Sequence, residues 1–198
     1  MLQSFHTNRV AHFGSGARIL RSNSPLEDDQ LRHAAPSVFA EFAHRSRSER
    51  YAYIPTSEVL RGLRAEGFLP FEVRQGGSRD DEKRGFTKHM LRLRHASADS
   101  LIGGDSIREL ILVNAHDGTS SYQLMSGVFR TVCSNGLIVA DGEAQMLRVP
   151  HKGDVIGKVI EGAYSIIGDT KQIAEQVKGM QALPLSNGEQ EAFAAAAR

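Results

Sequence analysis

Residues 86–95 alternate strictly between two kinds of side chain, a pattern typical of a β-strand whose two faces meet different surroundings. Leu91 and Leu93 occupy one set of positions, so this face is expected to enter the core. The opposite positions form a basic row with one apolar member: Lys88, Met90, Arg92 and Arg94. We expect this second face to be exposed to solvent.

Other segments also have the composition of strands. Residues 68–75 alternate, with Glu72 and Arg74 on the expected solvent side, and Pro70 indicates a sheet edge or a bulge. The run of Leu, Ile and Val at residues 110–113 is typical of a strand buried on both faces. Two shorter apolar segments are expected to continue the sheet: residues 137–139 and 146–149.

Helical spacing is clearest after the Asp-Gly turn at Asp117. Apolar residues recur there at intervals of three and four, which predicts an amphipathic helix that starts at Ser120 or Ser121. Its apolar face would contain Leu124, Met125, Val128, Phe129 and Val132. Asn135 and Gly136 would end the helix, because both residues tolerate the left-handed conformation of a helix exit.

Three more helices are predicted from start signals. Thr56 is a plausible cap for a helix over residues 56–66. Asp154 would cap another helix, with an apolar face that includes Val159. Ser186 and Glu189 make a capping box for the last helix.

These elements predict an α+β fold, an antiparallel β-meander packed against amphipathic helices, with a helical C-terminus. The strand connections are about ten residues or fewer, too short for the crossovers between parallel strands. Helices would cover one face of the sheet and leave the other open. We expect a partly irregular N-terminal extension over residues 1–50, an α+β core over 51–182 and a C-terminal helix over 183–198. The sequence stops inside the alanine-rich AFAAAAR, so we expect the natural chain to continue.

Composition narrows the class of protein. Of the 198 residues, 40% are hydrophobic and 24% are charged, as in ordinary globular proteins, and the net charge is +1. Any affinity for nucleic acid must therefore come from local clusters of cations. The single cysteine, Cys133, excludes an internal disulfide and is expected to be a packed thiol. There is no apolar signal core and no apolar run of about 18 residues, so we expect a cytoplasmic protein without a membrane partner.

Basic residues precede two tyrosines in the segment HRSRSERYAY, where Arg45, Arg47 and Arg50 come just before Tyr51 and Tyr53. Cations interleaved with aromatic rings can hold phosphates and stack on bases. The alternative is a solvated arginine loop followed by a strand that packs its tyrosines. Both interpretations stay open at the level of sequence.

A second basic segment lies near the helix start at Asp154, where Lys152 could contact a phosphate. A helix-capping loop is the alternative there, and an ordinary solvated sheet face is the alternative for the basic row. The predicted nucleic-acid-binding residues are Arg45, Arg47, Arg50, Lys88, Arg92, Arg94, Arg148, His151 and Lys152.

Histidines and carboxylates raise the possibility of a metal-dependent nuclease: His89, His95, His116, Asp117, His151 and Asp154. A metal centre needs several such ligands to converge, but none of these has HExxH or paired-carboxylate spacing. A turn explains His116 and Asp117 equally well. No GxSxG, GxxxxGKS/T or GxGxxG motif is present. We therefore expect no catalytic residue, no metal and no cofactor.

Several longer motifs resemble the YafZ/YfjQ-like proteins: RSERYAYIPT, LRAEGFLPF, FTKHMLRLRH, LVNAHDGTSSYQL, FRTVCSNGLIV, RVPHKGDV and KVIEGAY. This family, the domain of unknown function 932, is carried by plasmids and prophages. The resemblance covers residues 46–182. It implies a protein of a bacterial mobile genetic element and implies no established activity.

The expected architecture is also similar to the core of RecT/Redβ-type single-strand annealing proteins, which bind DNA in a positive groove of oligomeric rings. This resemblance is one of element order only. Our leading hypothesis is a homo-oligomer that binds or anneals single-stranded DNA through the basic sheet face. The alternatives are an anti-defence or regulatory factor with a host or phage protein partner, and the metal-dependent nuclease.

Overall fold

The structure is a computed structural model of the 198-residue chain. It describes residues 2–5, 9–11, 13, 16–47, 51, 53, 55–96, 101–102, 106–131, 138–140, 144–149, 157–159, 161–162, 164–165, 184 and 186–196. All statements below concern these residues.

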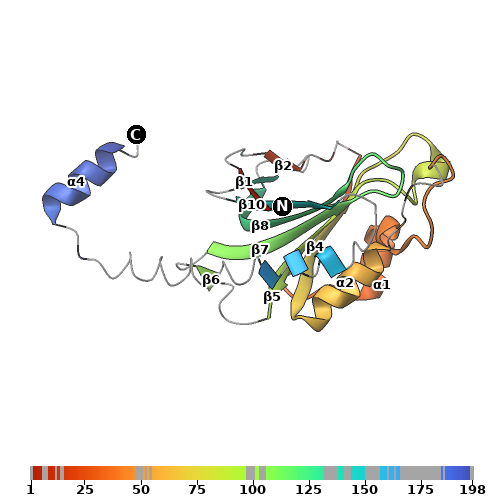
Figure 1. The fold of residues 1–198 in the computed structure, drawn as a ribbon, viewed down its shortest axis with the longest axis horizontal. Helices are drawn as coiled ribbons and strands as arrows, with labels where there is room; N and C mark the ends of the chain where they lie inside the picture. Colours follow the sequence, from red (N-terminus) through yellow and green to blue (C-terminus); the bar gives the residue numbers. More distant parts are fainter. Residues whose placement is uncertain are drawn as a thin grey trace.

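An antiparallel sheet dominates the fold (Figure 1). Its strands are β1 (Leu2–Phe5), β2 (Arg9–Ala11), β3 (Arg18–Arg21), β4 (Phe68–Gln75), β5 (His89–His95), β6 (Leu101–Ile102), β7 (Ser106–Asn114), β8 (Tyr122–Thr131), β9 (Ile138–Ala140) and β10 (Ala144–Val149). The main order is β1-β10-β8-β7-β5-β4-β3, while β9 pairs with β8 and β2, and β6 pairs with β7. Because β4, β5, β7, β8 and β10 follow one another as neighbours, the predicted meander is confirmed.

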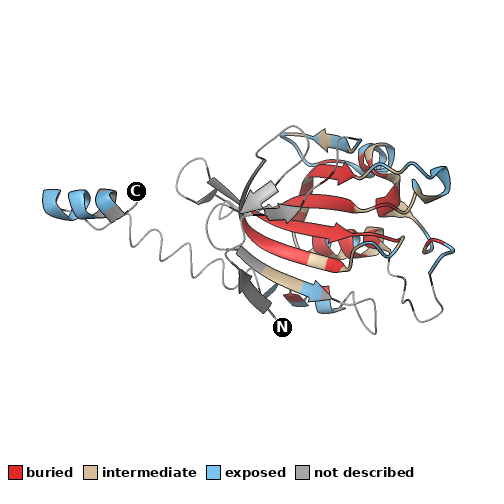
Figure 2. Cartoon of the chain, turned by 90° about the horizontal axis from the view of Figure 1, so that it is seen from above, coloured by how far each residue is buried: buried red, intermediate tan, exposed pale blue. Residues whose placement is uncertain are grey.

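Helices cover one face of this sheet. They are α1 (Asp28–Ala34), the 3-10 helix η1 (Pro36–Phe39) and α2 (Thr56–Ala65) (Figure 1). The main core lies between them and the sheet, whose central strands are largely buried (Figure 2). Leu91, Leu93 and Leu112 are fully buried in this core. The predicted α+β class and the core face of β5 are therefore confirmed.

The predicted helix after Asp117 is wrong, because residues 122–131 form strand β8. Leu124 is buried on the helix-covered face of the sheet, whereas its neighbour Met125 is buried in a second cluster on the opposite face. A strand buried on both faces shows no alternation, so its apolar residues can fit a helical spacing by chance. Pairing with β7 and β10 on either side decides the conformation.

The opposite face of the sheet is not open, so the expected exposure of the basic row is also wrong. Met90 is fully buried and only 2% of Arg92 is exposed. The chain passes from β2 at one edge to β3 at the other, and Phe13 on this path packs with Met90, Ile111 and Met125. The hydrophobic pattern does not predict β1, β2 or β3, because each of these strands has at most four residues.

Two predictions near the C-terminus are supported. Short helical stretches follow Asp154 at residues 157–159, 161–162 and 164–165, and Val159 belongs to the main core. The last helix, α4 (Asn187–Ala196), starts where predicted, and the Ser186 backbone N–H donates to Glu189 Oε2 at 2.8 Å. Cys133 lies outside the described residues.

Candidate functional site

Arg92 of the predicted basic row is engaged by carboxylates inside the protein. Its Nε donates to Glu109 Oε2 at 2.7 Å and its Nη1 donates to Glu72 Oε2 at 3.3 Å. Both glutamates are buried as well. Breaking such a pair leaves a buried charge without its partner, so Arg92 has a structural role and is not presented to a ligand.

Arg94 belongs to the same buried cluster. Its Nε donates to Glu109 Oε1 at 3.0 Å, its guanidinium lies 4.6 Å from the centre of the Phe71 ring, and 20% of its side chain is exposed. Arg74 also pairs with Glu72, although the sequence places both on a solvent face. This cluster of Glu72, Arg74, Arg92, Arg94 and Glu109 fills part of the second face of the sheet.

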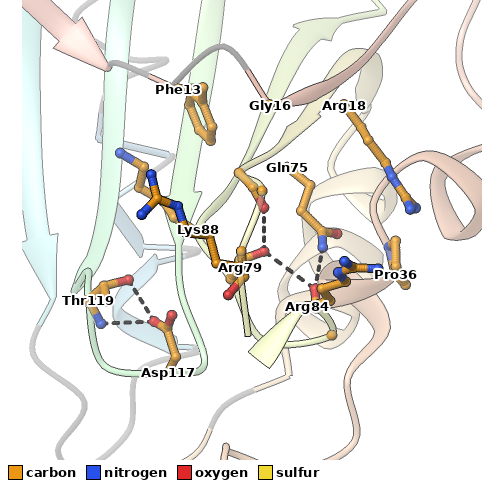
Figure 3. Close-up of a pocket in the computed structure, with 15 residues that line it drawn as sticks. Phe13, Gly16, Arg18, Pro36, Gln75, Arg79, Arg84, Lys88, Asp117 and Thr119 are labelled. Carbon is orange, nitrogen blue, oxygen red and sulfur yellow. Dashed lines mark hydrogen bonds between the residues drawn. The ribbon is translucent and has the colours of Figure 1, made fainter. Parts of the chain in front are cut away.

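Lys88, the remaining cation of the row, lines a pocket of about 800 Å³ at the end of the β4–β5 hairpin (Figure 3). Three arginines also line it. Arg18 begins β3, Arg79 lies in the hairpin connection, and Arg84 follows the 3-10 helix η2 (Asp81–Lys83). Chain segments distant in sequence thus bring four cations to one pocket, which we call the cationic pocket.

The cations differ in how the protein engages them. Lys88 Nζ lies 4.8 Å from the centre of the Phe13 ring, and burial lowers the pKa of Lys88 below its ordinary value. Arg84 Nη2 lies 2.7 Å from Asp81 Oδ1 in an exposed pair. Within the described part of the chain, Arg18 and Arg79 form no ion pair.

Glycines let backbone form part of the pocket wall. A Cβ on Gly77 would lie 2.9 Å from Gly16 O, so the two segments approach as closely as glycine allows. The hairpin connection is held by Thr87, whose Oγ1 donates to Gly76 O at 2.7 Å. Backbone close to the cavity is a common feature of sites that hold phosphate.

Asp117 and Thr119 line the cationic pocket from the β7–β8 turn (Figure 3). Asp117 Oδ1 accepts from Thr119 N at 3.0 Å and from Thr119 Oγ1 at 2.6 Å. Gly118 has a φ of 80°, which confirms the predicted Asp-Gly turn. A Cβ on Gly118 would lie 2.0 Å from Arg47 Nη1, so Arg47 rests against this turn.

A buried hydrogen-bond network lies behind the pocket. Ser37 Oγ donates to Gln75 Oε1 at 2.8 Å and lies 2.9 Å from His89 Nδ1. Since the Ser37 hydrogen is used, His89 Nδ1 must carry a proton and donate to Ser37 Oγ. His89 Nε2 then accepts from Thr56 Oγ1 at 2.8 Å. Gln75 extends this network to the pocket, because its Nε2 donates to Arg84 O at 2.6 Å.

Thr56 joins three strands to this network. Its Oγ1 accepts from Asn114 Nδ2 at 3.0 Å and from Tyr122 OH at 3.1 Å. The predicted cap role of Thr56 is wrong, because Pro55 occupies the N-cap of α2. Burial lowers the pKa of His89 well below its ordinary value, and the nearby His116 lowers it further, so His89 is neutral. Burial also raises the pKa of Tyr122.

The two tyrosines near the basic segment are used for packing and hydrogen bonding. Tyr51 OH donates to Ala115 O at 3.1 Å, and burial raises the pKa of Tyr51 to about 12. Tyr53 OH donates to Ala40 O. Arg45 is exposed and pairs with Glu82 of η2. Arg45 and Arg47 thus contact two segments that carry pocket residues.

Of the other predicted binding residues, only Arg148 is described, and it does not line the pocket. Arg148 is exposed, and its Nε lies 3.3 Å from Met146 Sδ. Arg50, His151 and Lys152 lie outside the described residues. Sequence reasoning missed Arg18, Arg79 and Arg84. The glycine-rich, charged connection GGSRDDEKRG offered a signal for the last two, but nothing local marked Arg18.

The histidines and carboxylates do not form a metal-binding group in the described ranges, where no three His, Cys, Asp or Glu residues come together in that way. His116 is buried in the core, and Asp117 lies in the adjacent turn. No helix in the part of the chain that the structure describes is long and apolar enough to cross a membrane.

Comparison with known proteins gives the family of the chain. The family model of the domain of unknown function DUF932 matches residues 43–198. The chain is similar to UPF0380 protein YfjQ and UPF0380 protein YafZ of Escherichia coli (strain K12), each 47% identical over 191 residues, or 96% of this chain and 68% of the relative. No solved structure matches. The resemblance predicted from the sequence motifs is confirmed: the chain belongs to the DUF932 family.

Proposed function

We propose that the protein binds single-stranded DNA by holding backbone phosphates in the cationic pocket. The observation that carries this proposal is the convergence of Arg18, Arg79, Arg84 and Lys88 on one pocket. The net charge of the whole chain is only +1, so this concentration of positive charge is local. The proposal moves the expected contact from the buried sheet face to the end of the β4–β5 hairpin.

Arginine is well suited to this role, because its planar guanidinium can donate two parallel hydrogen bonds to phosphate oxygens. Arg18 and Arg79 are the strongest candidates, since neither forms an ion pair within the described ranges. Gly16 and Gly85 in the wall would let a phosphate approach the backbone closely, because nothing lies within 4 Å of a Cβ at either position. A flexible single strand can place a phosphate in a recess, whereas duplex phosphates follow a stiff, convex surface.

Arg45 and Arg47 extend the proposed contact beyond the pocket. Arg45 pairs with Glu82 near Arg84, and Arg47 rests on the turn that carries Asp117. Arg50, Arg148, His151 and Lys152 stay as predicted contacts. We also propose that the protein forms a homo-oligomer and that it is encoded by a bacterial mobile genetic element.

The direct test is replacement of two pocket arginines, Arg18→Ala with Arg79→Ala. Each charge-assisted hydrogen bond contributes about 1.5–3 kcal/mol, so affinity for single-stranded oligonucleotides should fall at least roughly tenfold. The slope of log affinity against log salt should decrease by about 0.7 for each phosphate that the variant no longer neutralises. Fluorescence anisotropy over a range of salt concentrations measures both quantities.

A matched control removes two cations elsewhere, Arg61→Ala with Lys158→Ala, both exposed and outside the pocket. This control should leave affinity and salt slope nearly unchanged. Equal decreases in affinity for the two double variants would contradict a specific site. No binding by the wild type at low salt would reject the function and favour an anti-defence or regulatory protein, for which Phe42, 64% exposed, is a candidate contact.

A further inference from the structure

We propose that the cationic pocket also binds a base, and that Asp117 distinguishes one kind of base from another. The inference rests on the proposed function and names the unit recognised there: a nucleotide whose base carries an exocyclic amino group, with cytosine preferred over thymine. The arginines would hold the phosphate, while the Asp117 carboxylate would accept a hydrogen bond from the amino group.

The placement of the side chains supports a ligand with two unlike ends. Figure 3 shows Asp117 and Thr119 on one side of the pocket, Arg18 and Arg84 on the other, and Lys88 and Arg79 between them. A volume of about 800 Å³ is within the range of pockets that enclose small organic ligands. A ligand across this pocket would therefore meet cations along most of its length and an anion at one end.

The Asp117 carboxylate is held in place by hydrogen bonds to only one of its two oxygens. Both hydrogen bonds from Thr119 go to Oδ1, which fixes the orientation of the group. Among the described residues, none donates to Oδ2 or forms an ion pair with Asp117. One carboxylate oxygen therefore remains as an acceptor on the pocket wall.

Electrostatics makes Asp117 unfavourable for a ligand that is only phosphate, because its charge repels the anion. The same charge favours an amino group, and carboxylates commonly accept from N4 of cytosine. Thymine presents the carbonyl oxygen O4 at the equivalent position, which the carboxylate repels. Asp117 would thus lower affinity for thymine and raise it for cytosine.

The experiment compares oligo(dC) with oligo(dT) of equal length by fluorescence anisotropy, for the wild type and Asp117→Asn. The wild type should bind oligo(dC) several-fold more tightly. Asparagine keeps an oxygen for Thr119 but can turn an amide N–H toward O4 of thymine. The variant should therefore bind oligo(dT) more tightly than the wild type does and lose or reverse the preference.

Glu161→Gln is the matched control, since it removes an exposed carboxylate outside the pocket and should keep the preference. An unchanged melting temperature of Asp117→Asn would show that the turn is intact. Titration with dCMP and dTMP separates the two sources of the ligand. Tighter binding of dCMP than of dTMP would indicate that the ligand is a free nucleotide. A preference for oligo(dC) over oligo(dT) without a preference between the mononucleotides would indicate a nucleotide within a strand. Either result supports the contact between Asp117 and the base.

Two results would overturn the inference about Asp117 without contradicting the proposed binding of single-stranded DNA. One is equal wild-type affinity for oligo(dC) and oligo(dT). The other is an equal gain in affinity for both oligomers in Asp117→Asn, which would show that Asp117 only repels the phosphates of the strand and makes no contact with the base. Failure of the wild type to bind either oligomer at low salt would reject both proposals.

Discussion

At the scale of single residues, the charge of a side chain in the sequence does not reveal whether that side chain lies in a pocket or in the interior. Lys88, just before β5, and Arg92 within it belong to one side of the alternating pattern, yet Lys88 lines a pocket and Arg92 is buried between Glu72 and Glu109. The alternation identified the shared face correctly. It could not identify the partners, because Glu109 comes from another strand and pairs with Arg92 only after the sheet forms.

The burial of Arg92 leads to a prediction about stability. Arg92→Ala should lower the free energy of unfolding by about 3–5 kcal/mol, because it leaves two buried carboxylates short of a partner. Urea unfolding measures the change. Arg61→Ala is the control, since 79% of that side chain is exposed and its removal should cost less than about 1 kcal/mol. Similar effects of the two substitutions would contradict the buried role of Arg92.

His89 gives a second prediction at this scale. Its pKa in the folded protein lies well below the ordinary value of 6.5, so the unfolded chain binds this proton more readily. The free energy of unfolding should hold above pH 6.5 and fall as the pH drops below it, with a slope of at most about 1.4 kcal/mol per pH unit from this group. His89→Gln should flatten the curve between pH 5 and 7 in urea unfolding. An unchanged slope would show that His89 does not titrate on unfolding.

At the scale of elements, how well the sequence predicts a strand follows from the surroundings of that strand. β5 has unlike faces, so its alternation predicts both the strand and its core side. β8 is buried on both faces, with Leu124 in one cluster and Met125 in the other, and its pattern resembles a helix. The candidate site was predictable only through Lys88 and the charged, glycine-rich loop that follows β4. Arg18 reaches the pocket because β3 pairs with β4, which no local pattern indicates.

At the scale of the whole molecule, the path from β2 to β3 turns a one-sided sheet into one with two cores. Phe13, 1% exposed, lies on that path and joins Met90, Ile111 and Met125. Charged groups on the same face are neutralised by one another instead of by water. This explains how a strand with two arginines can lie inside the protein.

The crossing segment is the basis of a further stability prediction. Phe13→Ala should lower the free energy of unfolding by about 3–5 kcal/mol, because a fully buried ring leaves a cavity. It should also weaken single-stranded DNA binding, since Lys88 loses the ring beside its ammonium group. Thermal melting and anisotropy measure the two effects. A variant that melts like the wild type would mean that the second face does not depend on this ring.

The pairing of the first strand with the last also sets the order in which the protein can be completed during synthesis. Leu2 pairs with Leu147, so β1 has no partner until nearly the whole sheet sequence has left the ribosome. β3 can join β4 much earlier. The nascent chain therefore carries β1 unpaired until β10 has been synthesised, and contacts so distant in sequence favour slow folding.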